Sequence, residues 1–428
     1  MTLGLVLAGA ALVLSGGTVI DGYGNAPIPD GIVVIEGDRI LAVGGAGQVV
    51  IPEGAEIVST EGMTVLPGLW DMQVDLMRLG HGDARRWNET YGPLAERVVM
   101  PIAARQLLEA GVTSARDVAA PLEAATRVRG RVRERIIEGP SLYVSGPALR
   151  KLATAGTGAW HWEVAGAPDV RAKVQRLANA GVDYLLLADL ELWTAEELEA
   201  VVSEARIRGL AVHAIAAKPS DVVRGAAAQL DGFLGTVPGA GPYPAEMMQA
   251  ITGRLTQAGA RPMAWTPAIS APLNFESLKG NDEPLDDPRA TEHLPELVAA
   301  DVRGSLAGVG TALPDPTVGP AICEKLRQLD EAKVLLLLGS GAGEPGHLHS
   351  RATWQEIDFW VRDCGLPVVR AVRAATHDAA TAMGVGHESG AISPGKIADI
   401  IAVRGDVLRN PGLLQSVEIV VKSGRRVR

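Results

Sequence analysis

The sequence predicts an α/β protein in which a (β/α)8 TIM-like barrel is inserted into a small β-sandwich made from both chain ends. Two observations predict this fold. Short apolar runs alternate with amphipathic helical patterns along the middle of the chain, and both ends are rich in strand patterns. With 428 residues, 47% of them hydrophobic, the chain is long enough for a barrel and an attached domain. We place the first part of the sandwich in residues 1–65, the barrel in 66–380 and the second part of the sandwich in 381–428.

The first 60 residues are predicted to be strands and turns. Ala11–Asp21 is a strand that ends at a turn, and Gly31–Gly37 and Arg39–Val43 are strands joined by a Gly-Asp hairpin pair. The last 40 residues have the same character, with strands at Ala398–Val403 and Val417–Lys422. Two β-rich ends can pair into one sheet domain, which makes the long middle an insertion.

Eight apolar segments in the middle of the chain are candidate strands, and helical patterns such as Ala195–Arg208 lie between them. The candidates are Thr64–Trp70, Val112–Val118, Ser141–Gly146, Val182–Ala188, Leu210–Ala216, Leu230–Thr236, Pro262–Ala268 and Val334–Gly339. Eight strands, each followed by a helix, are typical of a (β/α)8 barrel. A doubly wound sheet is the alternative, but no GxGxxG follows an early strand.

Composition excludes several classes of partner. The net charge is 40 − 50 = −10, without a basic face for nucleic acid. The longest apolar run, Leu3–Leu14, is shorter than the about 20 residues of a membrane span, and no basic residue precedes it as in a signal peptide. The two cysteines, Cys323 and Cys364, are too few for a disulfide framework and form no CxxC pair for zinc. We expect a cytoplasmic protein with a small-molecule substrate or ligand, no nucleic-acid or membrane partner, and a homo-oligomer as an open option.

Several motifs follow one another in an order typical of a known family. They are Thr64–Leu76 (TVLPGLWDMQVDL), Gly111–Asp117 (GVTSARD), Leu335–Pro345 (LLLLGSGAGEP) and Ala371–Gly395 followed by Lys-Ile-Ala-Asp. The chain resembles the metal-dependent amidohydrolase superfamily through these motifs, and more narrowly its imidazolonepropionase and prolidase-like branch. The resemblance covers nearly the whole chain. It implies a barrel inserted in a small β-sandwich.

The resemblance also implies a metal site, which this sequence does not reproduce. In the family, the metal ligands are an HxH pair on strand one, lysine on strand four, histidines on strands five and six, and aspartate on strand eight. The bound metal activates a water molecule. At these positions the chain has Gln73, Asp75, Leu186, His213, Gly235 and Gly341. Only His213 keeps the family residue. Because a catalytic ion needs at least three protein ligands, we expect no catalytic metal and no cofactor.

Asp75 and His213 are the polar pair left in that layer. We expect them to face one cavity from strands one and five and to act as an acid/base pair, in which the carboxylate orients the imidazole and raises its pKa. The alternative is that both are remnants. Arg116 and Asp117, after strand two, are read as a structural ion pair.

The remaining candidates are expected around the barrel mouth. A Trp-His-Trp sequence, residues 160–162, follows strand three. We expect Trp160 and Trp162 to line an apolar side of the substrate pocket. His161 between them is a third catalytic candidate. The alternative is that the tryptophans cap a junction between a helix and the barrel. Gln73, Trp265 on strand seven and His349 after strand eight complete the expected substrate contacts, the last by resemblance.

Three classes of function are compatible with these residues. The favoured one is an enzyme without metal that uses acid/base chemistry for isomerisation, elimination or cyclisation of an apolar small molecule. The second is a non-catalytic pseudoenzyme or small-molecule binding protein. The third is a conventional metal-dependent hydrolase of C–N bonds. Whether the protein is an enzyme stays open, because function follows from the site and not from the fold.

Overall fold

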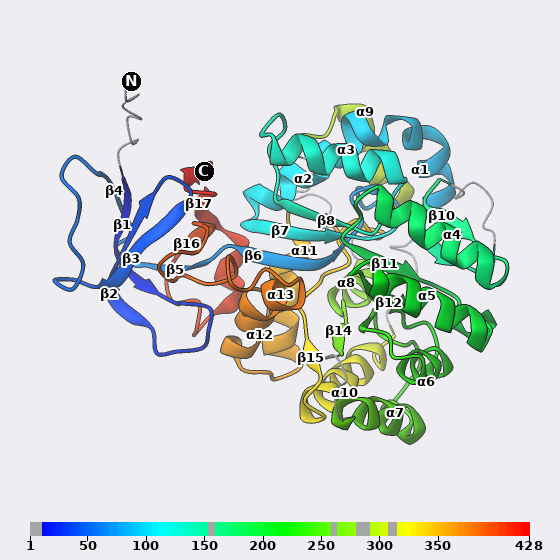
Figure 1. Ribbon diagram of the computed structural model, residues 1–428. Coiled ribbons are helices and arrows are strands. Elements are labelled where there is room, and N and C mark those ends of the chain that lie inside the picture. The colour runs from blue at the N-terminus through cyan, green and yellow to red at the C-terminus, as the bar shows by residue number, and fades with distance from the viewer. Residues whose placement is uncertain (1–10, 153–158, 258–262, 280–291, 307–314) are drawn as a thin grey trace, which may run out of the picture. The chain divides into compact units, whose positions relative to one another are not determined.

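The computed structural model describes residues 11–152, 159–257, 263–279, 292–306 and 315–428 (Figure 1). Its contacts divide the chain into two compact units. The first comprises Met1–Trp70, Leu108–Thr113 and Pro367–Arg428, and the second comprises Asp71–Leu107 and Ser114–Leu366. Each unit is described by itself below.

The first unit contains an eight-stranded sheet to which both chain ends contribute. Its strand order is β18-β17-β16-β5-β1-β2-β3, with β4 beside β1. The strands are β1 (Leu12–Val19), β2 (Ile28–Glu36), β3 (Arg39–Gly45), β4 (Glu56–Ser59), β5 (Met63–Pro67), β16 (Ile400–Arg404), β17 (Val417–Lys422) and β18 (Arg425–Arg426). The antiparallel pairing of β16 with β5, which sets Ile401 opposite Leu66, joins the two ends of the chain. The predicted pairing of the two ends is confirmed.

Two buried hydrophobic clusters of described residues belong to this sheet, and the larger one reaches both ends of the strand order. Ile40 of β3 and Ile419 of β17 come from opposite ends of the strand order, yet both belong to the same buried cluster as Leu14, Val33 and Ile400. A buried cluster that reaches both ends of the strand order is consistent with the predicted sandwich. The unit also contains the helices α12 (Val368–Ala374) and α13 (His377–Ala382) and the 3-10 helix η8 (Pro411–Gln415).

The parallel strands form two further sheets. One has the order β6-β7-β8 and the other the order β10-β9-β11-β12-β13-β14-β15. The strands are β6 (Leu69–Val74), β7 (Val112–Asp117), β8 (Ser141–Val144), β9 (Ala148–Arg150), β10 (His161–Glu163), β11 (Tyr184–Leu187), β12 (Ala211–Ile215), β13 (Gly232–Leu234), β14 (Ala264–Thr266) and β15 (Leu335–Leu336).

Hydrogen bonds connect these two sheets at both edges. Gly341 N donates to Gln73 O, and Val74 forms a parallel bridge with Ala342. At the other edge, Asp183 N donates to Val144 O. Eight strand positions, with β8 and β9 sharing the third, therefore follow one another around a closed arrangement, in agreement with the predicted barrel.

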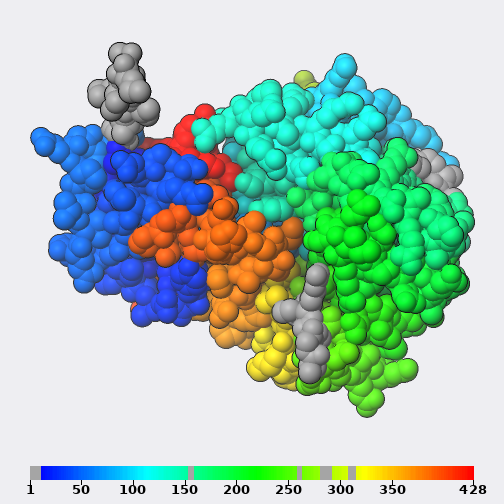
Figure 2. Space-filling model, viewed as in Figure 1, coloured from blue at the N-terminus to red at the C-terminus, as the bar shows by residue number. Residues whose placement is uncertain are grey.

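Helices follow the strands and cover them. They are α1 (Ala84–Tyr91), α2 (Met100–Glu109), α3 (Leu122–Arg133), α4 (Gly166–Asn179), α5 (Ala195–Ile207), α6 (Pro219–Ala227), α7 (Ala245–Thr256), α8 (Ser270–Leu278), α9 (Glu296–Leu306), α10 (Val318–Glu331) and α11 (Ala352–Asp358), with the short helices η1 (Gly92–Leu94), η2 (Ala95–Val99), η3 (Leu190–Leu192) and η7 (Phe359–Asp363). Figure 2 shows the green segment that contains α4 to α7 at the surface of the face drawn there. A capping box of Thr194 and Glu197 starts α5, the helix predicted there. Among the described residues, no helix has the length and apolar character needed to cross a bilayer.

One predicted strand is two strands in the structure. Thr64–Trp70 divides into the end of β5 and the start of β6, on either side of Gly68. A Cβ at Gly68 would lie 2.2 Å from the side chain of Thr113, so glycine is needed where the chain passes from one sheet to the other. The apolar run alone did not show this change of sheet.

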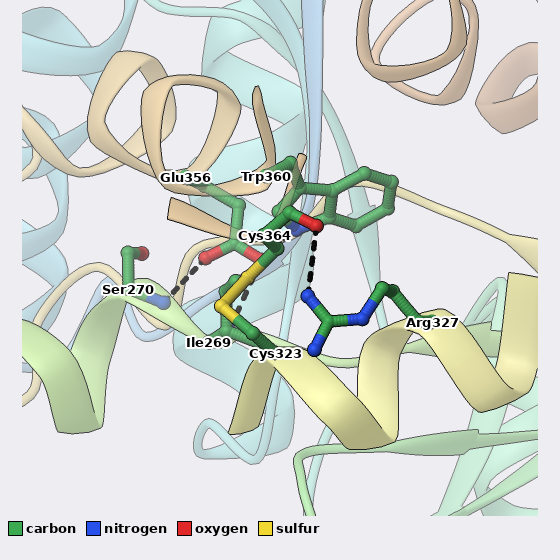
Figure 3. The surroundings of a disulfide bond; sticks show 7 residues. All are labelled: Ile269, Ser270, Cys323, Arg327, Glu356, Trp360 and Cys364. Atoms are coloured by element: carbon green, nitrogen blue, oxygen red, sulfur yellow. Dashed lines mark hydrogen bonds between the residues drawn. A yellow bond between two sulfur atoms is a disulfide. The ribbon is translucent and has the colours of Figure 1, made fainter. Parts of the chain in front are cut away.

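The two cysteines form a disulfide, which the sequence did not predict. Cys323 of α10 and Cys364, directly after η7, have Cα atoms 4.7 Å apart (Figure 3). Both are almost fully buried, and Arg327 Nη1 donates to Cys364 O at 3.1 Å. Two cysteines cannot form a framework, but a single cross-link needs only two helices that pack at the right distance.

A buried carboxyl group lies beside this disulfide (Figure 3). Glu356 of α11 accepts hydrogen bonds from Ile269 N at 3.0 Å, Ser270 N at 2.6 Å and Trp360 Nε1 at 2.7 Å. Burial raises the pKa of Glu356 to about 7, although these donors lower it. The two backbone donors connect α11 to the start of α8, and Trp360 connects it to η7.

The raised pKa of Glu356 predicts a pH-dependent difference between the wild type and Glu356→Gln. Between about pH 4.5 and 7 this residue is ionised in the unfolded chain but protonated in the native one, so rising pH destabilises the wild type through this group. The variant cannot titrate there. We expect the unfolding free energy of the variant, relative to the wild type, to rise by about 3 kcal/mol across that window. Denaturant titrations at several pH values measure it, and a constant difference would contradict the buried titration.

Candidate active site

The sequence-predicted site residues lie in or after strands of the second unit. Gln73 is in β6, His161 in β10, His213 in β12 and Trp265 in β14, with Asp75 directly after β6. The C-terminal ends of the strands are where (β/α)8 barrels carry their active sites. The structure brings some of these side chains together and separates others.

Asp75 is a partly exposed carboxyl group at the end of the first barrel strand. Its Oδ1 accepts from Met77 N at 2.9 Å, and its Oδ2 lies 3.1 Å from Arg78 Nε. Arg78 also reaches Glu344, with 3.5 Å between Nη1 and Oε2. Burial raises the pKa of Asp75 to about 6, and the nearby Arg78 charge opposes part of that rise. A carboxyl group that titrates near neutral pH can both accept and return a proton.

His213 is buried and is not paired with Asp75. Its ring meets the Tyr184 ring edge-on, with 5.7 Å between centroids, and no hydrogen bond or ion pair to Asp75 occurs in the described part of the chain. Burial, with a smaller contribution from Arg116, holds the pKa of His213 well below its usual value. The expected acid/base pair is therefore wrong: this imidazole is neutral and its pKa is lowered, where a carboxylate partner would raise it.

Arg116 and Asp117 are not an ion pair either. Arg116 Nε donates to Met72 O at 2.8 Å and Nη2 donates to Thr266 Oγ1 at 3.0 Å. Asp117 Oδ1 instead accepts from Leu76 N at 3.0 Å, and burial raises the pKa of Asp117 well above its usual range. Neighbouring residues on a strand point to opposite faces, which separates these two side chains.

The Trp160–Trp162 segment places a neutral histidine beside an ion pair. His161 Nδ1 lies 3.3 Å from Arg150 Nη1, and Arg150 forms two hydrogen bonds of 2.9 Å to Asp189. Burial, followed by the charges of Arg150 and Arg78, lowers the pKa of His161 to about 4. The Trp160 ring lies edge-on to His161. His161 is thus a hydrogen-bonding group at neutral pH rather than a cation.

Two of the three expected tryptophans pack on helix-side partners. The Trp162 ring lies under the Arg176 guanidinium of α4, 4.6 Å from its centroid, as in the alternative of a helix junction. Trp265 is fully buried, with its ring centroid 5.2 Å from that of Phe233 and 5.8 Å from that of Tyr243. Phe233 packs on Gly225 of α6, so Trp265 belongs to the layer between strands and helices. Its expected place in a substrate wall is wrong.

The two remaining predicted residues lie close to the Asp75 strand end. His349 Nε2 is 3.1 Å from Asp75 O, and burial lowers the pKa of His349 to about 4. Gln73 N donates to Asp71 at 3.1 Å, while Gln73 Oε1 is buried without a partner among the described residues. His349 therefore lies against the Asp75 backbone, and Gln73 lies two residues before Asp75 in the same chain segment.

Sequence reasoning missed four charged residues that shape this end of the barrel. Arg78 and Glu344 flank Asp75, and Arg150 and Asp189 flank His161. Asp189 adopts a left-handed backbone with φ 58, which aspartate tolerates better than most residues. Their position just after predicted strands was the available signal, since loops at that edge carry function in barrels.

A cavity of about 330 Å3 opens beside β13. Its lining includes Thr236, Pro272, Val318 and Lys325. Lys325 Nζ donates to Val237 O at 2.8 Å and Gly239 O at 2.6 Å, and desolvation lowers its pKa. The cavity offers room for a small molecule next to the sixth strand.

The residues at the family's metal positions do not fit a metal centre. Leu186 packs with Tyr184 and Leu234 in an apolar cluster, and a Cβ at Gly235 would have no atom within 4 Å. No three His, Cys, Asp or Glu side chains within the described residues of the second unit approach one another closely enough to share an ion. The Arg116 guanidinium adds a fixed positive charge that acts on His213. Leu186 and Gly235 offer no ligand atoms, and the Arg116 charge repels a divalent cation.

Comparisons with known proteins agree with this architecture. Residues 323–427 match the model of the amidohydrolase family. A Xaa-Pro dipeptidase with methionine bound in its active site is 22% identical, with a TM-score of 0.76 over 98% of this chain and 100% of that chain. A putative prolidase from Bifidobacterium longum is 21% identical, with a TM-score of 0.74 over 98% and 95% of the two chains. Molinate hydrolase is 20% identical, with a TM-score of 0.75 over 98% and 95%. No match is found among curated proteins.

The solved amidohydrolase structures share the fold of this chain, and the match of residues 323–427 to the amidohydrolase family agrees with the resemblance seen in the sequence. The family model matches the closing part of the chain, and the solved hydrolases share the fold over nearly all of it. The particular chemistry is a separate question, because these structures share no more than 22% of their residues with this chain.

Proposed function

We propose that this chain is an enzyme that works without the family's metal centre and uses Asp75 as a general acid/base on a small, largely apolar molecule. The reaction class is isomerisation, elimination or cyclisation. The observation that carries this proposal is the Asp75 carboxyl group, which is partly exposed at a strand end and has its pKa raised to about 6. Perturbed carboxyl groups in such positions are candidates for proton transfer.

The surrounding groups fit a proton-transfer role for Asp75. Above about pH 6 the carboxylate takes a proton from a carbon or heteroatom of the substrate, and Arg78, 3.1 Å from Oδ2, stabilises the charged form. The protonated carboxyl group then returns the proton at another atom. His349, which contacts Asp75 O, is neutral at that pH and serves as a hydrogen-bonding group. His161 and Arg150, beside Asp189, are expected to position the substrate.

Two alternatives stay open under this proposal. A non-catalytic binding protein is supported by the unpaired His213, which behaves as a buried neutral group. Conventional hydrolysis of a C–N bond is supported by the shared fold of prolidase, molinate hydrolase and phenylurea hydrolase B structures. The unsuitable donor set argues against that second alternative. A small-molecule partner, and a homo-oligomer as an option, remain part of the proposal.

Elemental analysis distinguishes the proposal from conventional hydrolysis. We expect the protein, purified without chelators, to contain well under one zinc, manganese or iron per chain, because leucine and glycine side chains offer no ligand atom at three of the positions. Protein from cells grown with added metal is the control, because it excludes a metal shortage during growth as the cause of a low metal content. One ion per chain in the wild type that is absent from His213→Ala would contradict the proposal and support metal-dependent hydrolysis.

The cytoplasmic location expected from the sequence is also open to test. Disulfides are rare in the reducing cytosol and persist in oxidising compartments, and the Cys323–Cys364 bond favours the latter. We propose to settle the location from the thiol state in acid-quenched cells: free thiols support the cytoplasm, and a bridge supports an oxidising compartment.

A further inference from the structure

Three buried polar atoms inside the barrel have no hydrogen-bond partner in the described part of the chain. They are Nη1 of Arg116, Oε1 of Gln73 and Nδ1 of His213. Buried polar groups in folded proteins are almost always paired, so each such atom calls for a physical explanation. The guanidinium group is the most costly of the three because it is charged.

Contacts link the residues that carry these atoms. Arg116 lies over the Tyr184 ring, 5.1 Å from its centroid, and the same ring meets His213. Arg116 Nη2 also contacts Thr266, whose methyl group lies beside Gly339 together with Gln73. A Cβ at Gly339 would be 2.4 Å from that methyl group and 2.9 Å from Gln73 Cβ. Arg116 is therefore linked to His213 through the Tyr184 ring and to Gln73 through Thr266, while His213 Nδ1 faces β13, 2.7 Å from where a Gly232 Cβ would lie.

Among the residues that the structure describes, no carboxylate forms a hydrogen bond with Arg116. Asp71 is the acidic residue that acts on it, but Asp71 accepts from Ser340 N at 2.9 Å, Ser340 Oγ at 2.6 Å and Thr353 Oγ1 at 2.7 Å. Burial raises the pKa of Asp71, so this carboxyl group is a weak counter-charge. A fully buried guanidinium without a paired anion is expensive, and an anion brought by a ligand would remove that cost.

We propose that Arg116 receives the carboxylate of a small organic acid, with Gln73 and His213 as neutral hydrogen-bonding groups beside it. This inference rests on the proposed role of the barrel as a small-molecule site and names the class of ligand. Nη1 is the free donor of a guanidinium that Met72 O and Thr266 Oγ1 already hold in place. Gly235, directly after β13, would place a Cβ with no atom within 4 Å.

The groups beside Arg116 are suited to a carboxylate. The amide of Gln73 presents either its oxygen or its nitrogen after a flip, and a neutral imidazole donates from either ring nitrogen. The apolar cluster of Leu186 and Leu234 fits an apolar body attached to the acid. In this arrangement a fixed guanidinium provides the positive charge in the layer where the family has metal.

Formate, the smallest carboxylate, is the probe. We expect the melting temperature of the wild type to rise with sodium formate and to level off, compared with sodium chloride at the same ionic strength, because formate binds the native state. Arg116→Met should abolish this rise. Arg116→Lys keeps a charge without the planar fork, and should weaken formate binding by about 10–100-fold.

Arg254→Met is the matched control. Arg254 is also a buried arginine with two unpartnered nitrogens among the described residues, but it lies on α7 outside the barrel. This variant should keep the full response to formate. Equal effects of formate and chloride on the wild type, or an unchanged formate response in Arg116→Lys, would overturn the proposal.

The outcome is separable from the proposed acid/base function. Formate binding needs Arg116 and not Asp75, so Asp75→Asn should keep the formate response even where turnover is lost. If Asp75→Asn loses turnover and the wild type shows no formate response, only the proposed carboxylate site is contradicted. If the wild type responds saturably to formate and Asp75→Asn keeps full turnover, only the acid/base role is contradicted.

Discussion

Turnover of the true substrate by Asp75→Asn is expected to fall by about 10²–10⁴-fold, the usual contribution of a general acid or base. Asparagine keeps the size of the side chain and can still accept from Met77 N, but it cannot take up or return a proton. The measurement is kcat/KM on a substrate found by screening small organic molecules. Glu246→Gln, an exposed acidic residue on α7, is the matched control and should leave turnover unchanged.

The pH profile gives an independent test of the same role. If the carboxylate is the base, kcat/KM rises with pH through about 6, the pKa to which burial raises Asp75. Arg78 lowers that pKa, so Arg78→Met should move the rising limb to higher pH. A purely structural Arg78 would lower activity at every pH without moving the limb. Full turnover in Asp75→Asn would show that Asp75 does not act as the acid or base.

The architecture was largely predictable because it depends on patterns along the chain. Apolar runs that end in turns marked the strands, and β-rich ends such as Arg39–Val43 and Val417–Lys422 predicted a shared sheet. The pairing of β16 with β5 depends on the same alternation of buried side chains. The division of Thr64–Trp70 into two strands escaped this reasoning because an apolar run does not show which sheet it enters.

The site was harder to predict because chemistry depends on distances between strands. The motifs placed His213 on a barrel strand and Asp75 at the end of one, but strands one and five are far apart around an eight-stranded barrel. Trp265 was assigned to the wrong face, since a three-residue strand carries little alternation. The separation of Arg116 from Asp117 was within reach of the sequence, because adjacent strand residues face opposite ways.

The disulfide could not be deduced from the sequence. Cys323 and Cys364 are 41 residues apart, and only the packing of α10 against η7 brings their Cα atoms to 4.7 Å. The segment between them contains β15, the glycine-rich loop after it, and His349. The cross-link therefore fixes both ends of the chain segment that supplies one side of the candidate site.

Loss of this cross-link is expected to lower the free energy of unfolding by about 4 kcal/mol. Removing a bridge frees the unfolded chain, and a closed loop of about 40 residues corresponds to that value in the chain-entropy account. Denaturant unfolding of Cys323→Ala/Cys364→Ala, compared with the oxidised wild type, measures it. A reducing agent should destabilise the wild type by a similar amount and leave the double variant unchanged. Equal stability of the two proteins would mean that helix packing alone holds α10 against η7.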